Sequence, residues 1–111
     1  MSRLTQLTEY DFHDSLLEEI SCDNNKRVFL KIDFCNWKQE GYDDSKEETS
    51  IISIVFNDVS SVVIPKFELN SDEIIKFEVF ENGCVKIIVF NDMSNSTYEI
   101  IIHAKSVEII K

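Results

Sequence analysis

Hydrophobic residues alternate with polar or mixed residues along most of this chain, with the period of two that is typical of β-strands. The clearest run covers residues 26–36, where Val28, Leu30, Ile32 and Phe34 would share one face. Four more rows have the same spacing: Ile52, Ile54 and Phe56; Ile75, Phe77 and Val79; Val85, Ile87 and Val89; Tyr98, Ile100 and Ile102. Each row predicts a strand with one buried face.

Further patterns extend this prediction towards both ends of the chain. Residues 14–22 are predicted as a strand on which Leu16, Ile20 and Cys22 face one way, and 107–111 as a closing strand. Leu4, Leu7 and Tyr10 keep roughly helical spacing, so we expect a short helix or turn within residues 1–12.

One turn is specified by its residue types. Asn82-Gly83 stands between two alternating runs, which is typical of a two-residue β-hairpin loop of type I′. That turn needs positive φ at both central residues, which Asn tolerates and Gly adopts readily. We therefore expect antiparallel strands near 73–81 and 84–91.

These elements predict one all-β domain over residues 1–111, mainly antiparallel, with seven or eight strands and little helix. A sandwich or a strongly curled sheet would cover the apolar rows. Residues 38–50 form the one long predicted connection, and they are rich in Asp and Glu.

The charge narrows the classes of partner. Asp and Glu number 21 against 11 Lys and Arg, a net charge of −10 over 111 residues. We therefore expect no nucleic-acid partner, because such proteins neutralise phosphates with basic residues. No apolar run approaches the roughly 18 residues of a membrane span, and no secretory leader is evident, so we expect a cytoplasmic protein with no membrane partner. Its cysteines, Cys22, Cys35 and Cys84, lack a Cys-x-x-Cys pair and are expected to be reduced and buried.

A catalytic site is not expected. Phe12-His13-Asp14-Ser15 contains a base, an acid and a hydroxyl, but neighbouring residues on a strand point to opposite faces. We expect Asp14 and Ser15 to bond backbone amides where the chain enters its first strand. No cofactor is expected either, because two glycines cannot form a glycine-rich phosphate loop.

A metal or small-ligand site is the alternative that the histidines leave open. His13 and His103 are the only two, and they would meet if the first and last strands were neighbours. Asp11, Asp14 or Asp33 could then complete a nitrogen and oxygen ligand set, with Asp14 the one beside His13, although no ligand-type spacing requires one.

An aromatic and acidic stretch is the candidate partner-binding site. It comprises Trp37, Tyr42, Asp43, Asp44 and Glu47. Trp and Tyr contribute large contact areas at low entropic cost and are enriched in protein interfaces. The alternative is that Trp37 closes one end of the core and the acidic residues form a solvated connection.

Three segments carry a resemblance. Phe12-His13-Asp14-Ser15-x-Leu17, Phe34-Cys35-Asn36-Trp37 and Ile54-Val55-Phe56-Asn57-Asp58-Val59, with an acidic tyrosine-containing loop between the last two, resemble a family of small uncharacterised bacterial β-proteins. In size and acidity that family is similar to bacterial toxin-immunity proteins. The resemblance implies no catalytic residues.

We therefore expect a non-catalytic protein-binding module, of the immunity type, that neutralises a basic partner protein. The alternatives are a homo-oligomeric structural protein, such as a homodimer that pairs through a sheet edge or face, and a small-ligand or metal binder at His13, Asp14 and His103.

Overall fold

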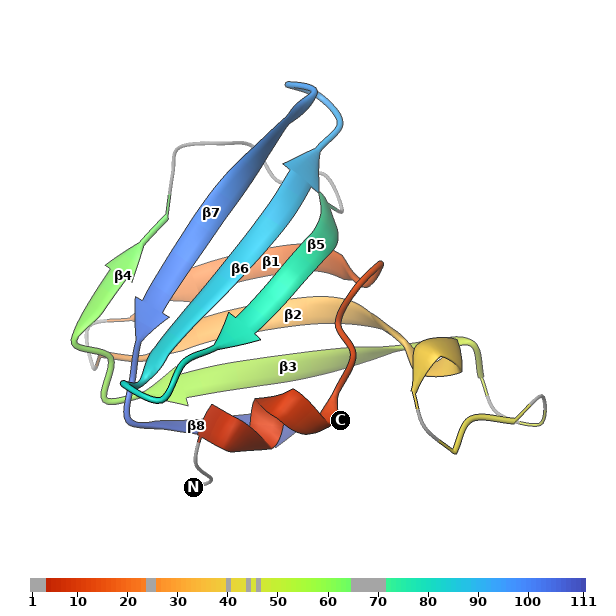
Figure 1. The fold of residues 1–111 in the computed structure, drawn as a ribbon, viewed down its shortest axis with the longest axis horizontal. Coiled ribbons are helices and arrows are strands. Elements are labelled where there is room, and N and C mark those ends of the chain that lie inside the picture. The colour runs from red at the N-terminus through yellow and green to blue at the C-terminus, as the bar shows by residue number, and fades with distance from the viewer. Residues whose placement is uncertain (1–3, 24–25, 40, 44, 46, 65–71) are drawn as a thin grey trace.

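The computed structural model describes residues 4–23, 26–39, 41–43, 45, 47–64 and 72–111. The described residues form eight β-strands and two short 3-10 helices (Figure 1). In chain order they are η1 (Leu4–Glu9), β1 (Leu16–Cys22), β2 (Val28–Cys35), η2 (Asn36–Lys38), β3 (Thr49–Asn57), β4 (Ser61–Val63), β5 (Asp72–Val79), β6 (Cys84–Asn91), β7 (Ser96–His103) and β8 (Ser106–Ile110).

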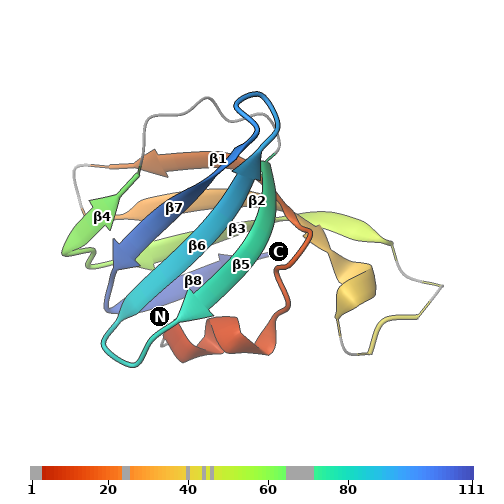
Figure 2. The ribbon, with the colours of Figure 1, turned by 45° about the horizontal axis from the view of Figure 1, so that its top comes forward.

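All strand pairs are antiparallel, in the order β4-β7-β6-β5-β1-β2-β3-β8. The sheet has two halves of four strands, and Figures 1 and 2 show that one half lies across the other. The core fills the space between the halves. This arrangement confirms the prediction of an all-β fold with little helix and shows that it is one strongly curled, open sheet.

The predicted rows of hydrophobic residues form the core. The fully buried members come from both halves: Val28, Leu30, Ile32, Ile52, Ile54, Phe56, Val85, Ile87, Val89, Ile100, Ile102 and Val107. Burying a side chain of this size stabilises the fold by about 1.5–3 kcal/mol. The rows therefore dictate which face of each strand turns inwards.

Among the described residues, the two halves meet where β1 pairs with β5, through Leu16–Glu73 and Leu17–Asp72. Each strand carries a β-bulge next to this junction, at Glu18 in β1 and at Ile75 in β5. A bulge adds one residue, bends the strand and increases its twist, which suits a sheet that folds over itself.

The bulges explain two wrong predictions of facing. Leu17, rather than Leu16, is fully buried, because the extra residue at Glu18 lies between Leu17 and the partly buried Ile20. On β5, Ile74 is fully buried and Ile75 is exposed, whereas Phe77 and Val79 pack against the core as predicted.

The predicted hairpin is present, but the prediction of a type I′ turn for its loop is wrong. β5 pairs with β6 up to Val79–Val85, and the Gly83 amide donates to the Phe80 carbonyl at 3.3 Å. Gly83 has a φ of 84°, and Asn82 is not among the described residues with positive φ. The loop thus has three residues and places only its glycine in the left-handed region, a common alternative to type I′.

Smaller differences concern a strand, a cysteine and the long connection. β4 is absent from the predicted rows because it has only three residues. Cys22 is exposed, contrary to expectation, since it is the last residue of β1. β3 begins at Thr49, which shortens the predicted 38–50 connection.

None of the described helices has the length and apolar character needed to cross a membrane.

Candidate functional site

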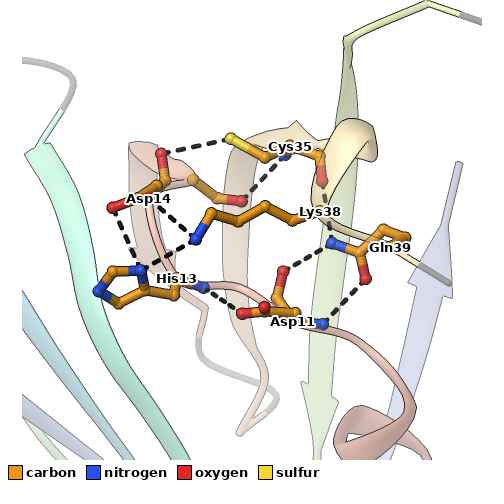
Figure 3. A network of polar contacts seen from close by, with 7 residues as sticks. Asp11, His13, Asp14, Cys35, Lys38 and Gln39 are labelled. Carbon is orange, nitrogen blue, oxygen red and sulfur yellow. Dashed lines mark hydrogen bonds and ion pairs between the residues drawn. The ribbon is translucent and has the colours of Figure 1, made fainter. Parts of the chain in front are cut away.

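The candidate site is built where two segments meet at one end of the sheet. The first is the connector, residues 10–15, which leads from η1 to β1. The second is the acidic loop, residues 36–48, which joins β2 to β3 and projects away from the two sheet halves in Figures 1 and 2. Figure 3 shows the polar contacts between them.

A bend at Asp14 brings charged groups together. Asp14 has a φ of 69°, in the left-handed region that Asp tolerates better than most residues. Its carboxylate lies 3.0 Å from the Lys38 ammonium and 3.2 Å from Nδ1 of His13 (Figure 3). Adjacent residues therefore do contact one another here, contrary to the expectation for a straight strand.

The protonation of this cluster is set mainly by Lys38 and Glu73. The hydrogen bond from Lys38 lowers the pKa of Asp14, and the same contact raises the pKa of Lys38. A side-chain hydrogen bond joins Glu73 of β5 to Asp14 and raises the pKa of Glu73. The carboxyl groups of Asp14 and Glu73, with the Lys38 ammonium, thus link the connector, η2 and β5.

The two potential nucleophiles have structural roles. Ser15 is fully buried, and its Oγ accepts the Cys35 amide hydrogen at 3.0 Å, as predicted for a residue that bonds the backbone. The buried Cys35 thiol lies 3.4 Å from the Asp14 carbonyl oxygen, and burial raises its pKa. The thiol therefore stays protonated at neutral pH, which removes the reactive thiolate.

Gln39 attaches the acidic loop to the connector. Its Oε1 accepts the Asp11 amide hydrogen at 2.9 Å, and its Nε2 donates to the carbonyls of Asp11 at 2.7 Å and Cys35 at 2.9 Å. On the other side of η2, the amides of Asn36 and Trp37 both donate to the Glu48 carbonyl. The base of the loop is thus held from two directions.

The hydrogen bonds at the base of the loop hold η2 in place and leave the Trp37 side chain exposed to solvent. Its side chain is 49% exposed, and the Lys38 ammonium lies 5.4 Å from its ring centre. Trp37 does not close the core, so the structure removes the alternative interpretation of this residue. Asp43 and Glu47 are also exposed. Asp44 lies outside the described residues.

Tyr42 lies in the wall of a hollow of about 370 Å³, and Trp37 is not among the described residues that line it. Tyr10, Phe34 and Gln39 also line this hollow, together with Glu9 and Lys111. The sequence predicted Tyr42 but missed Glu9, Tyr10 and Lys111. No local pattern indicates them, because the fold joins positions that are far apart in the chain.

The hypothesis of one site shared by His13, Asp14 and His103 is wrong. His103 pairs with Cys84 at one end of β6, and Asp14 bonds Ile74, which pairs with Val89 near the other end. Five steps along a strand separate these levels, or about 17 Å. His103 instead has its Nδ1 3.0 Å from Oγ of Ser61.

The described residues contain no group of three His, Cys, Asp or Glu side chains that could hold a metal ion. No protein-family model, curated protein or solved structure matches this chain.

Proposed function

We propose that this protein is a non-catalytic binding module that captures a basic partner protein with its acidic loop. The observation that carries the proposal is the half-exposed indole of Trp37 on a firmly bonded support. Exposed Trp side chains surrounded by polar residues are frequent hot spots of protein interfaces.

The support matters for affinity because binding must otherwise include the entropic cost of ordering a loop. Gln39 holds the loop to the connector, and the Asn36 side-chain amide donates to the Glu47 carbonyl at 3.2 Å. Both Trp37 and the nearby acidic residues are therefore presented in one arrangement before a partner arrives.

The charge favours a basic partner. Asp43, Glu47 and Glu48 are exposed residues of the acidic loop that also carries Trp37, on a chain of net charge −10. Like-charge repulsion disfavours acidic competitors, and the field accelerates encounter with basic proteins. The resemblance to a family of small bacterial β-proteins, which is similar in size and acidity to toxin-immunity proteins, adds a cytoplasmic, toxin-neutralising role to the proposal.

The test compares two clusters that each combine an exposed apolar residue with acidic charge. The partner is isolated on the immobilised protein, identified by mass spectrometry and used in binding measurements. Trp37→Ala combined with Asp43→Lys should weaken binding at least tenfold, as expected for loss of a hot spot. The matched control is Met93→Ala combined with Asp92→Lys, on the exposed β6–β7 loop. An acidic partner, or equal losses in both variants, would contradict the proposal.

A second proposal, a homodimer through the sheet edge, is favoured by one observation. β8 is an edge strand, and its Ile110 is 53% exposed. Ile51 of β3, 51% exposed, lies diagonal to it, because Ile110 pairs with Ser53. Exposed apolar residues at a free edge favour pairing with another strand. Light scattering should then give twice the chain mass, and Ile51→Lys with Ile110→Lys should restore the monomer; a monomeric wild-type protein contradicts this proposal.

A further inference from the structure

The hollow beside the acidic loop already contains a cation of the protein's own. The Lys111 ammonium lies 4.9 Å from the centre of the Tyr10 ring, within the range of a cation–π contact. Both residues line the hollow of about 370 Å³. For the described part of the chain, this ring is the only interaction partner that the structure gives the Lys111 side chain.

The ring that receives this cation is held in place by other aromatic rings. Its centre lies 5.8 Å from that of Phe34, edge to face, and 5.9 Å from that of Phe12. Phe12 in turn stacks on Phe77 of β5 at 4.3 Å. Such contacts fix the orientation of Tyr10, so its negative face stays directed towards the position of the ammonium.

The remaining walls suit a cation attached to a longer side chain. Glu9 contributes a carboxylate and Tyr42 a second aromatic ring. Gln39 contributes a rigid wall, since both ends of its amide are engaged by Asp11 and Cys35. A volume of about 370 Å³ lies at the lower end of the range for small-ligand sites.

We propose that this hollow is a binding site for a single cationic side chain of the partner, preferably arginine, and that Lys111 is the cation it displaces. Arginine is preferred because its guanidinium is planar, weakly hydrated and stacks on aromatic faces. Lys111 is exposed and has no ion pair among the described residues, so within this part of the chain its displacement breaks only the contact with the ring. The proposal relies on the proposed function only for the nature of the molecule that carries the arginine.

The test uses a small probe and the whole chain, so it needs no partner. N-acetyl-arginine methylamide is titrated into labelled protein and followed by NMR, with the neutral isostere N-acetyl-citrulline methylamide as the control. The amide signals of Gly41 and Tyr42 should shift with arginine and not with citrulline. N-acetyl-lysine methylamide should bind more weakly than the arginine probe.

Three variants separate the roles of ring, carboxylate and resident cation. Lys111→Gln should strengthen binding of the arginine probe by about two- to fivefold, the factor expected for one exposed cation–π contact. Tyr10→Leu should abolish binding, whereas Tyr10→Phe, which keeps the ring, should retain it. Glu9→Gln should weaken binding. Dispersed NMR spectra establish that each variant is folded. If Tyr10→Leu does not fold, Lys111→Gln still tests the proposal.

Equal shifts with arginine and citrulline, or unchanged affinity in Lys111→Gln, would overturn the proposal. These outcomes are independent of the Trp37 experiment. A partner that binds through Trp37 while the arginine probe does not bind refutes the cation site alone. A probe that binds in the hollow, with no loss of partner binding on Trp37→Ala and Asp43→Lys, refutes the proposed function alone.

Discussion

The connector has two ends that differ in how firmly their charged groups are held. At the Asp14 end, Lys38 lies 3.0 Å from one carboxylate oxygen of Asp14 and is only 20% exposed. At the Tyr10 end, the exposed Lys111 touches an aromatic ring and has no ion pair within the described ranges. Both ends join segments that are distant in sequence: the first places Lys38 in an ion pair with Asp14, and the second places Lys111 against the Tyr10 ring.

This difference separates a structural role from a binding role. Removing Lys38 would leave the Asp14 and Glu73 carboxyl groups without their neighbouring cation. The contacts among Lys38, Asp14 and Glu73, the network, therefore favour a single arrangement of these side chains. Removing Lys111 leaves an aromatic hollow beside an acidic surface, which another cation can fill. We therefore expect variants of the network to change stability and variants of the hollow to change binding.

The largest effect on stability is expected for Ser15→Ala. The Ser15 hydroxyl is the buried partner of the Cys35 amide, and a buried donor without a partner costs about 1–3 kcal/mol. Urea unfolding followed by Trp37 fluorescence measures this loss. Ser21→Ala, at an exposed position of β1, is the matched control and should change the free energy of unfolding by less than about 0.5 kcal/mol. Equal stability of the two variants would show that the Ser15 bond is not required.

Gln39→Leu should have an intermediate effect, about 1–2 kcal/mol, because three partly exposed hydrogen bonds are lost together. Its local consequence is more specific. With the base of the acidic loop released, the Cys35 thiol should react faster with a maleimide, as measured by mass spectrometry of the labelled peptides. Exposed Cys22 is the internal control, and its rate should be the same in both proteins. An unchanged rate of Cys35 labelling would mean that Gln39 does not hold the base of the acidic loop to the connector.

Much of the fold could be predicted from the sequence because alternation specifies which face of a strand is buried. The β-bulges at Glu18 and Ile75 could not, since a bulge inserts one residue without a characteristic composition. Each bulge shifts the alternation by one position, which is why Leu17 and Ile74 replace Leu16 and Ile75 inside. The same limit applies to Gly83, where the residue types permit two hairpin loops and the strand register selects one.

The site was less predictable than the fold, for a related reason. The sequence indicated Trp37 and Tyr42 because aromatic and acidic residues lie close together in the acidic loop. It could not indicate that Tyr10 meets Lys111, because that contact depends on where β8 joins the curled sheet. The left-handed conformation of Asp14 was equally hidden, and it brings the His13 and Asp14 side chains into contact where a straight strand would point them to opposite faces.

The smallest effect, and the one that best distinguishes the network from an ordinary surface cluster, is the pH dependence of Glu73→Gln. The pKa of Glu73 is raised, chiefly by its hydrogen bond to Asp14, so its contribution to stability is complete below the ordinary range of a glutamate, about pH 4.3. That contribution is lost as the pH rises through the raised pKa. Asp14 behaves in the opposite way: its pKa is lowered, chiefly by Lys38, and its contribution is lost as the pH falls.

The wild-type free energy of unfolding should therefore peak where Asp14 is ionised and Glu73 is still protonated, and decline towards pH 7. Glutamine donates to Asp14 at every pH, so Glu73→Gln should remove the decline, be more stable than wild type at pH 7 and converge with it near pH 4. The charge of His13 lowers the pKa of Glu73 and that of Asp92 raises it, and both act less strongly than the hydrogen bond to Asp14. Glu78→Gln, on the same strand and paired with Lys76, is the control that should leave the decline in place. A decline that persists in Glu73→Gln would show that the two carboxyl groups share no proton, and Lys38 alone would then account for the low pKa of Asp14.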